Sequence, residues 1–197
     1  MNEDTLLFEL DTGGLELNPE PGQFVQLTPS DSLTLPRPFS IAGAEGGTVE
    51  VLFEVRGRGT RELAGRREGE TLRALGPLGT GFDVPDDVGR ATLVAGGIGV
   101  AGLRFLARRL SDSGVPLEVI VGARSADRLL HEVMPAESHS GNVAVSVATD
   151  DGSAGARGTA CDVLSERIDA LGEKDIVYAC GPRAMLRVHY VWKNIRY

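Results

Sequence analysis

The stretch that most constrains the fold of this chain is Ala91–Leu103, which reads ATLVAGGIGVAGL. A short apolar run is followed by Gly96, Gly97 and Gly99, and a helix-like segment continues through Arg109. A strand, a glycine turn and a helix in this order aim backbone N–H groups and a helix N-terminus at a phosphate group. The spacing is G-G-x-G, which differs from the G-x-G-x-x-G of the dinucleotide fingerprint. The pattern therefore predicts either a phosphate-binding turn or a tight strand-to-helix turn without a ligand.

The segments before this stretch predict an all-β domain. Short runs with partial apolar–polar alternation are separated by Gly, Pro, Asp and Asn, which form turns. Several short strands at this spacing are typical of a small barrel or sandwich. The predicted strands are Leu6–Leu10, Phe24–Leu27, Thr48–Val55 and Thr71–Leu75, and a strand-like IAGA segment follows Ser40.

From Arg90 onward the pattern changes to alternating strands and helices. The apolar strands are continuous instead of alternating, as expected for a parallel sheet that is covered on both faces. We expect a β domain over residues 1–87 and an α/β domain over residues 88–197. The predicted strands are Ala91–Ala95, Leu117–Ala123, Val143–Thr149 and Asp175–Gly181, and the predicted helices are Gly99–Leu110, Asp127–Val133 and Thr159–Leu171.

Composition excludes several classes of function. The net charge of −8 argues against a nucleic-acid partner, which normally meets a basic surface. No apolar run approaches the roughly 20 residues that span a bilayer, and Met1–Leu10 carries acidic residues where a signal peptide would be basic. We therefore expect a cytoplasmic protein without a membrane partner. The two cysteines form neither a disulfide framework nor a complete metal site, so no metal ligands are predicted.

Two motifs in the first half carry residues suited to an anion. In RPFS, a proline fixes the backbone beside Arg37 and Ser40, and an arginine next to a hydroxyl suits a phosphate or a polar ring edge. In RGRGT, from Arg56 to Thr60, glycines and arginines together could form an anion nest. The alternatives are an ordinary surface arginine for the first motif and a plain hairpin turn for the second.

In the second half, TDDGS (149–153) and CGP (180–182) each follow a predicted strand. Ligands of open α/β sheets bind beyond the carboxyl ends of the strands, where these turns and GGIG would meet. Cys180 is either a small buried hydrophobic residue or a contact to a cofactor ring. The three histidines show no Ser–His–Asp order, so hydrolase chemistry has little support.

Taken together, the motifs PGQF, RPFS, GRGT, GPLGTGF, GGIGVA and CGP resemble, in order and spacing, the ferredoxin reductase superfamily. Within it, the chain is most similar to the electron-transfer subunits of class 1B dihydroorotate dehydrogenases, from about Glu9 to Leu186. The resemblance implies an N-terminal antiparallel Greek-key β-barrel that binds FAD and a C-terminal Rossmann-like α/β domain that binds NAD.

The resemblance also implies roles for particular residues. One set matches the flavin-binding arginine–serine motif, the strand beside the flavin and the turn that holds its pyrophosphate: Arg37, Pro38, Phe39, Ser40, Leu52, Phe53, Glu54, Gly59 and Thr60. A second set matches the nicotinamide-nucleotide loop and the turn near the nicotinamide ring: Gly96, Gly97, Ile98, Gly99, Cys180, Gly181 and Pro182. Cys180 is the one catalytic residue that the resemblance implies.

The chain departs from the family pattern at three places. Glu54 stands where relatives usually carry a basic residue, and Arg56 could compensate for its charge. Gly102 stands where a proline normally closes the nucleotide loop, which predicts a looser turn. Relatives bind a [2Fe–2S] cluster through four cysteines after the CGP turn, whereas no cysteine follows Cys180 here. A truncated copy, a fragment and a cluster-free variant are all compatible with this ending.

The function that follows is a flavoprotein subunit that passes electrons between NADH and a catalytic dihydroorotate dehydrogenase subunit through FAD. The alternatives are a stand-alone NAD(P)H:acceptor flavin reductase and a non-catalytic, degenerate flavin- or nucleotide-binding module. NAD is favoured over NADP, although Arg124 is a candidate for contacting a 2′-phosphate.

Overall fold

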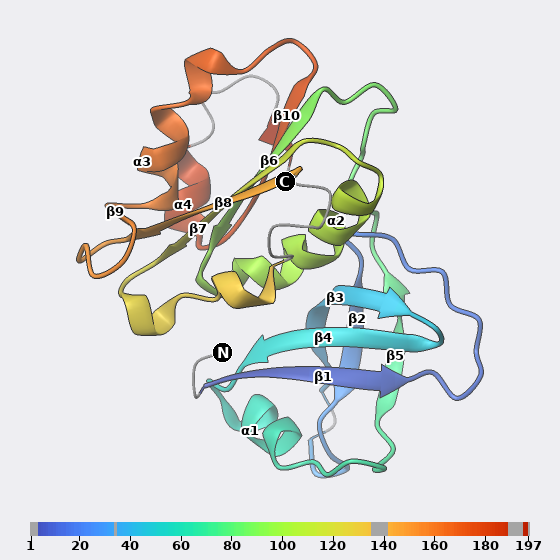
Figure 1. Cartoon of the computed structure of the whole chain (residues 1–197). Coiled ribbons are helices and arrows are strands. Elements are labelled where there is room, and N and C mark those ends of the chain that lie inside the picture. Colours follow the sequence, from blue (N-terminus) through green and yellow to red (C-terminus); the bar gives the residue numbers. More distant parts are fainter. Residues whose placement is uncertain (1–3, 34, 135–141, 189–194, 197) are drawn as a thin grey trace.

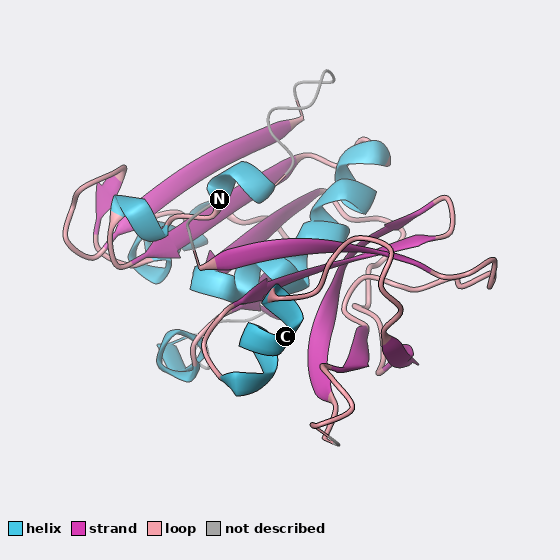
Figure 2. Cartoon of the chain, turned by 90° about the horizontal axis from the view of Figure 1, so that it is seen from below, coloured by secondary structure: helices cyan, strands magenta, loops and turns pink. Residues whose placement is uncertain are grey.

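The computed structural model describes residues 4–33, 35–134, 142–188 and 195–196. Its strands form two sheets, and the long helix α2 (Val100–Asp112) lies between them (Figure 1). The first sheet is antiparallel, with strand order β1-β4-β3-β2-β5, and the second is parallel, with order β11-β10-β6-β7-β8-β9. This arrangement confirms the predicted fold class. Seen from below, the strands again gather in two groups with helices among them (Figure 2).

The antiparallel sheet forms because its strands alternate between the barrel core and the outside. In β4 the side chains of Val49, Val51 and Phe53 enter the core, whereas Glu50 and Leu52 point to the other face. Leu52 is nevertheless buried, because the second half of the chain covers that face. The strands are β1 (Thr5–Asp11), β2 (Phe24–Thr28), β3 (Arg37–Glu45), β4 (Thr48–Glu54) and β5 (Arg73–Leu78).

One helix interrupts the half that was predicted to be all-β. RGRGT runs into helix α1 (Arg58–Ala64), so the hairpin-turn alternative is wrong. The Thr60 hydroxyl accepts the backbone N–H groups of Arg56 at 2.9 Å and Gly57 at 3.1 Å, which fixes the start of the helix. Leu63 is fully buried in the barrel core and anchors its other end. Two glycines in five residues hide this helix from a propensity argument.

The parallel sheet confirms the apolar runs predicted as strands. Its strands are β6 (Arg90–Gly96), β7 (Leu117–Ala123), β8 (Val143–Thr149) and β10 (Asp175–Cys180), with the short edge strands β9 (Ala156–Arg157) and β11 (Ile195–Arg196). Its helical segments, besides α2, are α3 (Ala160–Ser165), α4 (Arg183–Val188), η1 (Gly97–Gly99), η2 (Ala126–Arg128), η3 (His131–Val133) and η4 (Ile168–Ala170). None of the helices in the described part of the chain is long and apolar enough to cross a membrane.

Two predicted helices are shorter than their patterns indicated. The expected helix at 159–171 ends as α3 at Ser165, whose hydroxyl donates to the Cys161 carbonyl at 2.8 Å, and only the 3-10 turn η4 follows. A serine that bonds back to residue i−4 competes with the helix backbone. The expected helix at 127–133 is divided into η2 and η3, because Leu129 takes an extended conformation and is buried with Leu130.

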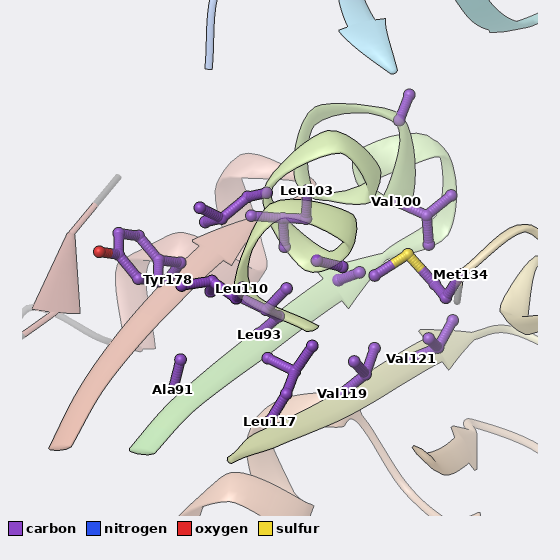
Figure 3. Close-up of a cluster of buried hydrophobic side chains, with 14 of the residues drawn as sticks. Ala91, Leu93, Val100, Leu103, Leu110, Leu117, Val119, Val121, Met134 and Tyr178 are labelled. Atoms are coloured by element: carbon purple, nitrogen blue, oxygen red, sulfur yellow. The ribbon is translucent and has the colours of Figure 1, made fainter. Parts of the chain in front are cut away.

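Both faces of the parallel sheet are covered, which explains its continuous apolar strands. Ala91, Leu93 and Ala95 of β6 face α2, whereas Val94 faces α3. Figure 3 shows Leu103 and Leu110 of α2 above Leu93 and the neighbouring β7 side chains. The last strand of the first sheet ends at Leu78 and the next begins at Arg90. The proposed boundary between residues 87 and 88 lies in this connection and stays a prediction.

Candidate functional site

A pocket of about 750 Å³ lies between the two sheets, and its walls come from both. Its volume is typical of a small-molecule site. The residues that the resemblance assigns to the flavin and nucleotide sites all line this pocket, although they come from five separate segments. The pocket is also lined by residues outside the two assigned sets: Arg56, Gly57, Arg58, Ala101 and Gly102.

The barrel side of the pocket is formed by the adjacent strands β3 and β4. Arg37 Nη1 donates to the Leu35 carbonyl at 3.0 Å, which holds the guanidinium at the pocket edge. The Phe39 and Phe53 rings lie 5.4 Å apart between centroids, and Phe53 is buried in the barrel core. Phe53 therefore supports the wall more than it offers its ring to a ligand.

Glu54 and Arg56 form the pair that the sequence indicated. Arg56 Nη2 lies 2.6 Å from Glu54 Oε2, and the glutamate side chain is only 17% exposed. The same oxygen is buried without a hydrogen bond of suitable geometry in the described residues, so the contact is a purely ionic one. The negative charge of Glu54 is thus balanced by a neighbouring residue of the same pocket, which removes the main objection to an anionic ligand there.

The start of α1 meets the arginine of the RPFS motif. A side chain at Gly59 would place its Cβ 3.2 Å from Arg37 Nε, so glycine lets this arginine cross the first turn of the helix. The N–H groups of Arg56 and Gly57 are already bonded to Thr60, so they are not available to an anion as the predicted nest required. Arg58 is paired with Glu62 at 3.0 Å. Among the arginines that line the pocket, Arg37 has no carboxylate partner in the described residues.

Gly96 at the end of β6, and Gly97 and Gly99 after it, are each glycines for a different structural reason. Gly97 has φ +53° and nothing within 4 Å of an added Cβ, so it faces open pocket in a left-handed conformation. A Cβ at Gly99 would lie 2.1 Å from the Cys180 carbonyl oxygen, and one at Gly96 would lie 2.7 Å from Met185 Sδ. Gly97 therefore leaves open space in the pocket, whereas Gly99 makes room for the CGP turn.

Cys180 lies where the two walls meet. A Cβ at Gly102 would be 3.1 Å from Cys180 Sγ and 3.6 Å from Ser40 Oγ, so these two side chains approach each other over the glycine. Gly102 is buried in the first turn of α2, and the looser turn expected from the missing proline stays a prediction. Burial raises the pKa of the Cys180 thiol, which keeps it neutral at physiological pH. Cys180 is half-buried and lines the pocket, so its predicted contact to a cofactor ring stays a prediction.

The remaining candidates lie away from the pocket. Arg124 and the TDDGS turn follow β7 and β8 at the carboxyl end of the sheet, where the Arg124 carbonyl accepts the Asp151 N–H at 3.2 Å. Cys161 is buried at the start of α3. No group of three or more His, Cys, Asp or Glu residues that could hold a metal ion occurs in the part of the chain that the structure describes. His139 and His189 lie outside the described residues.

An antiparallel barrel and a parallel α/β unit that share one pocket define a ferredoxin-reductase-like oxidoreductase. The profile of the oxidoreductase NAD-binding domain matches residues 93–189. The structure of an NADH-dependent reduced ferredoxin-NADP oxidoreductase superposes with a TM-score of 0.82 and 28% identity, covering 98% of this chain and 70% of that one. An Amycolatopsis cytochrome P450 reductase gives a TM-score of 0.76 at 27% identity, with 95% and 60% covered.

The curated relatives narrow this class. The electron transfer subunit of dihydroorotate dehydrogenase B (NAD(+)) from Lysinibacillus sphaericus is 39% identical over 190 residues, covering 93% of this chain and 71% of the relative. The Listeria monocytogenes subunit is 38% identical over 182 residues, covering 89% and 68%. The Caldanaerobacter subterraneus subunit is 36% identical, covering 86% of this chain but only 64% of the relative. The chain belongs to the family of dihydroorotate dehydrogenase B electron transfer subunits, and it spans about two thirds of their length.

Proposed function

We propose that this chain is an NADH-linked flavoprotein that passes electrons between NAD(H) and the catalytic subunit of a dihydroorotate dehydrogenase. The observation that carries the proposal is the single pocket in which a barrel wall and a glycine-rich nucleotide loop face each other. Two redox cofactors must meet for a hydride to pass between them, and each wall offers the groups that one of them requires. Residues 1–87 would hold FAD and residues 88–197 would receive NADH.

The barrel wall suits a flavin with a diphosphate. FAD, when bound, supplies the chemistry: it accepts a hydride and passes the electrons on one at a time. Arg37 is free of carboxylate partners among the described residues and lies against the first turn of α1, where its charge can meet a phosphate. Ser40 offers a hydroxyl at the junction of the walls, and Leu52 gives that junction an apolar surface. The barrel side thus binds and orients its ligand without an acid or a base.

The loop side suits a nicotinamide dinucleotide. Gly97 presents backbone to the open pocket, so a pyrophosphate can approach it without meeting a side chain. Cys180, Gly181 and Pro182 close the pocket where a transferred hydride would pass. Because burial keeps the Cys180 thiol neutral, it can pack against an uncharged ring without adding charge beside it. Hydride transfer needs no side-chain proton, which agrees with a wall whose one titratable group among the described residues, Cys180, stays neutral.

Anaerobic reduction of the flavin tests the proposal. The chain should bind FAD in stoichiometric amount, and NADH should bleach the flavin absorbance in a stopped-flow experiment. Addition of a dihydroorotate dehydrogenase catalytic subunit and orotate should then reoxidise the flavin. Reoxidation by ferricyanide alone, with no effect of the catalytic subunit, would favour the stand-alone reductase. Failure to bind FAD would favour the non-catalytic module.

A related prediction concerns iron. A [2Fe–2S] cluster is held by four ligands, usually cysteine thiolates, and this chain has two cysteines. Cys161 is buried at the start of α3 and Cys180 lines the pocket. The chain expressed with iron and reconstituted should therefore contain no stoichiometric iron or acid-labile sulfide. A stoichiometric [2Fe–2S] signal in the reduced-state EPR spectrum would contradict this prediction.

A further inference from the structure

A buried arginine joins the two halves of the molecule. Arg104 of α2 is only 6% exposed, and its Nε donates to the Val133 carbonyl at 2.8 Å. Its Nη1 donates across the junction to the Ala42 carbonyl of β3 at 3.1 Å and pairs with the Glu50 carboxylate of β4. Arg108, one helical turn later, binds the same carboxylate with Nη1 3.0 Å from Oε1. Two guanidinium groups of one half thus hold a single carboxylate of the other.

The barrel makes room for this contact with a glycine. Gly43 pairs with Glu50 across the sheet, next to a shift in strand register that begins after Ile41. A Cβ at Gly43 would lie 2.6 Å from Glu50 Oε2 and 2.9 Å from Arg108 Nη1. Both distances are shorter than real Cβ contacts allow, so any side chain here would push against the ion pair. We call Gly43, Glu50, Arg104 and Arg108 the interdomain clamp.

The clamp fixes an orientation more strictly than apolar packing can. Burial lowers the pKa of Arg104 to about 10, and the neighbouring Arg108 acts in the same direction, so the guanidinium remains charged at neutral pH. A buried charge is tolerated only while it is paired and hydrogen-bonded, and guanidinium–carboxylate bonds are directional. Ala42 and Leu52, which pack beside the clamp, would tolerate sliding. The charged groups therefore define how the second half sits on the barrel.

The residues of the interdomain clamp and their partners lie close in the sequence to residues that line the pocket. Ala42, whose carbonyl Arg104 holds, is two residues from Ser40, and Arg104 is two residues from Gly102. Ser40 and Gly102 approach each other at the point where the pocket walls meet. Helix α2 also begins directly after the glycine loop. A displacement of α2 against the barrel would therefore change the separation of the two walls.

We infer that Arg104, held by Glu50 and Arg108, is a positioning residue that sets how closely the bound nicotinamide ring approaches the flavin. This inference rests on the proposed function and goes beyond it, because the clamp touches neither cofactor site. Its role is to hold the nucleotide loop at one distance from the barrel wall. Hydride transfer is sensitive to that distance, since a misplacement of about 1 Å can lower a rate by roughly 10²-fold.

Three variants test the clamp in different ways. Glu50→Gln removes the charge and keeps the shape, Gly43→Ala pushes against the ion pair, and Arg108→Gln removes only the half-exposed arm. Arg109→Gln is the matched control, because it makes the same charge change on an exposed residue of the same helix. The measurements are FAD affinity, the limiting rate of flavin reduction at saturating NADH, the long-wavelength charge-transfer absorbance and the melting temperature.

The clamp variants should bind FAD as the wild type does but lose about 10- to 100-fold in limiting rate, with a weaker charge-transfer band. Arg109→Gln should match the wild type in all four measurements. If Glu50→Gln does not fold, Arg108→Gln decides, because its side chain is partly exposed. Folded clamp variants with lower melting temperatures but an unchanged limiting rate and band would overturn the inference alone. A wild-type flavin that NADH does not reduce would refute the proposed function, and the inference with it.

Discussion

Replacing Gly99 by alanine should destabilise the protein through one steric overlap. The backbone at this position has φ −57°, which alanine adopts freely, and alanine is the better helix former. The added Cβ, however, would lie 2.1 Å from the Cys180 carbonyl oxygen and 2.6 Å from its carbon. Both are backbone atoms, so no rotamer change relieves the overlap, and one segment must move by about 1 Å to reach ordinary contact. We expect a loss of about 1–3 kcal/mol in stability.

The same displacement should slow catalysis, because it moves the Cys180–Pro182 turn that closes the pocket. The limiting rate of flavin reduction should fall on the order of 10²-fold while FAD stays bound. Gly97→Ala is the contrast: its Cβ meets nothing within 4 Å, but φ +53° is left-handed. It should cost about 1–2 kcal/mol and weaken NADH binding with little effect on the limiting rate. Thermal unfolding and stopped-flow reduction measure both variants. A Gly99→Ala protein with wild-type stability and limiting rate would refute the contact argument.

Three further predictions concern single side chains. Arg37→Ala should weaken FAD binding by about 1.5–3 kcal/mol, measured by fluorescence titration, and equal affinities would exclude Arg37 from the flavin site. Hydrogen bonds from Thr159 keep the pKa of Asp162 below its usual 3.8, so the charged carboxylate stabilises α3 at neutral pH. Thr159→Ala should therefore cost about 0.5–2 kcal/mol in urea unfolding at pH 7, a difference that should shrink as the pH falls below 3.8. Because burial raises the pKa of Cys180, alkylation by iodoacetamide should be slow at pH 8 and accelerate beyond pH 9, as peptide mass mapping would show.

The fold was largely predictable because most of its strands are short apolar runs with clear ends in the sequence. The runs at 117–123 and 143–149 are mostly apolar, and the structure begins and ends both strands at the predicted residues. Helix α1 was missed because its stability comes from tertiary and local contacts, namely the burial of Leu63 and the hydrogen bonds of Thr60. A propensity argument sees only the two glycines of RGRGT. The helix after Thr159 was predicted too long because the back-bond of Ser165 is a matter of geometry.

The residues that line the pocket could be predicted from the sequence, but the structural role of each residue could not. Each motif is short and weak by itself, and only their order along the chain indicated that they belong to one site. The sequence could not tell that Gly97 faces the pocket while Gly99 faces a carbonyl, because both are simply glycines after a strand. The pairing of Glu54 with Arg56 was accessible, since it needed only the spacing of two opposite charges.

Of the residues in the interdomain clamp, the sequence pattern gives no sign of the role of Glu50 but does mark Arg104 as unusual. Glu50 occupies an outward position of an alternating strand, where a carboxylate normally faces water, and only the packing of α2 on that face buries it. Arg104 gave a clearer signal, because it lies among apolar residues in GLRFLA, where a solvent-facing arginine is out of place. The flanking Leu103 packs on the parallel sheet and Phe105 in the barrel core, so this turn of α2 contacts both halves at once. A charged residue between two such anchors has a partner across the junction, and the orientation of the two pocket walls follows from that pairing.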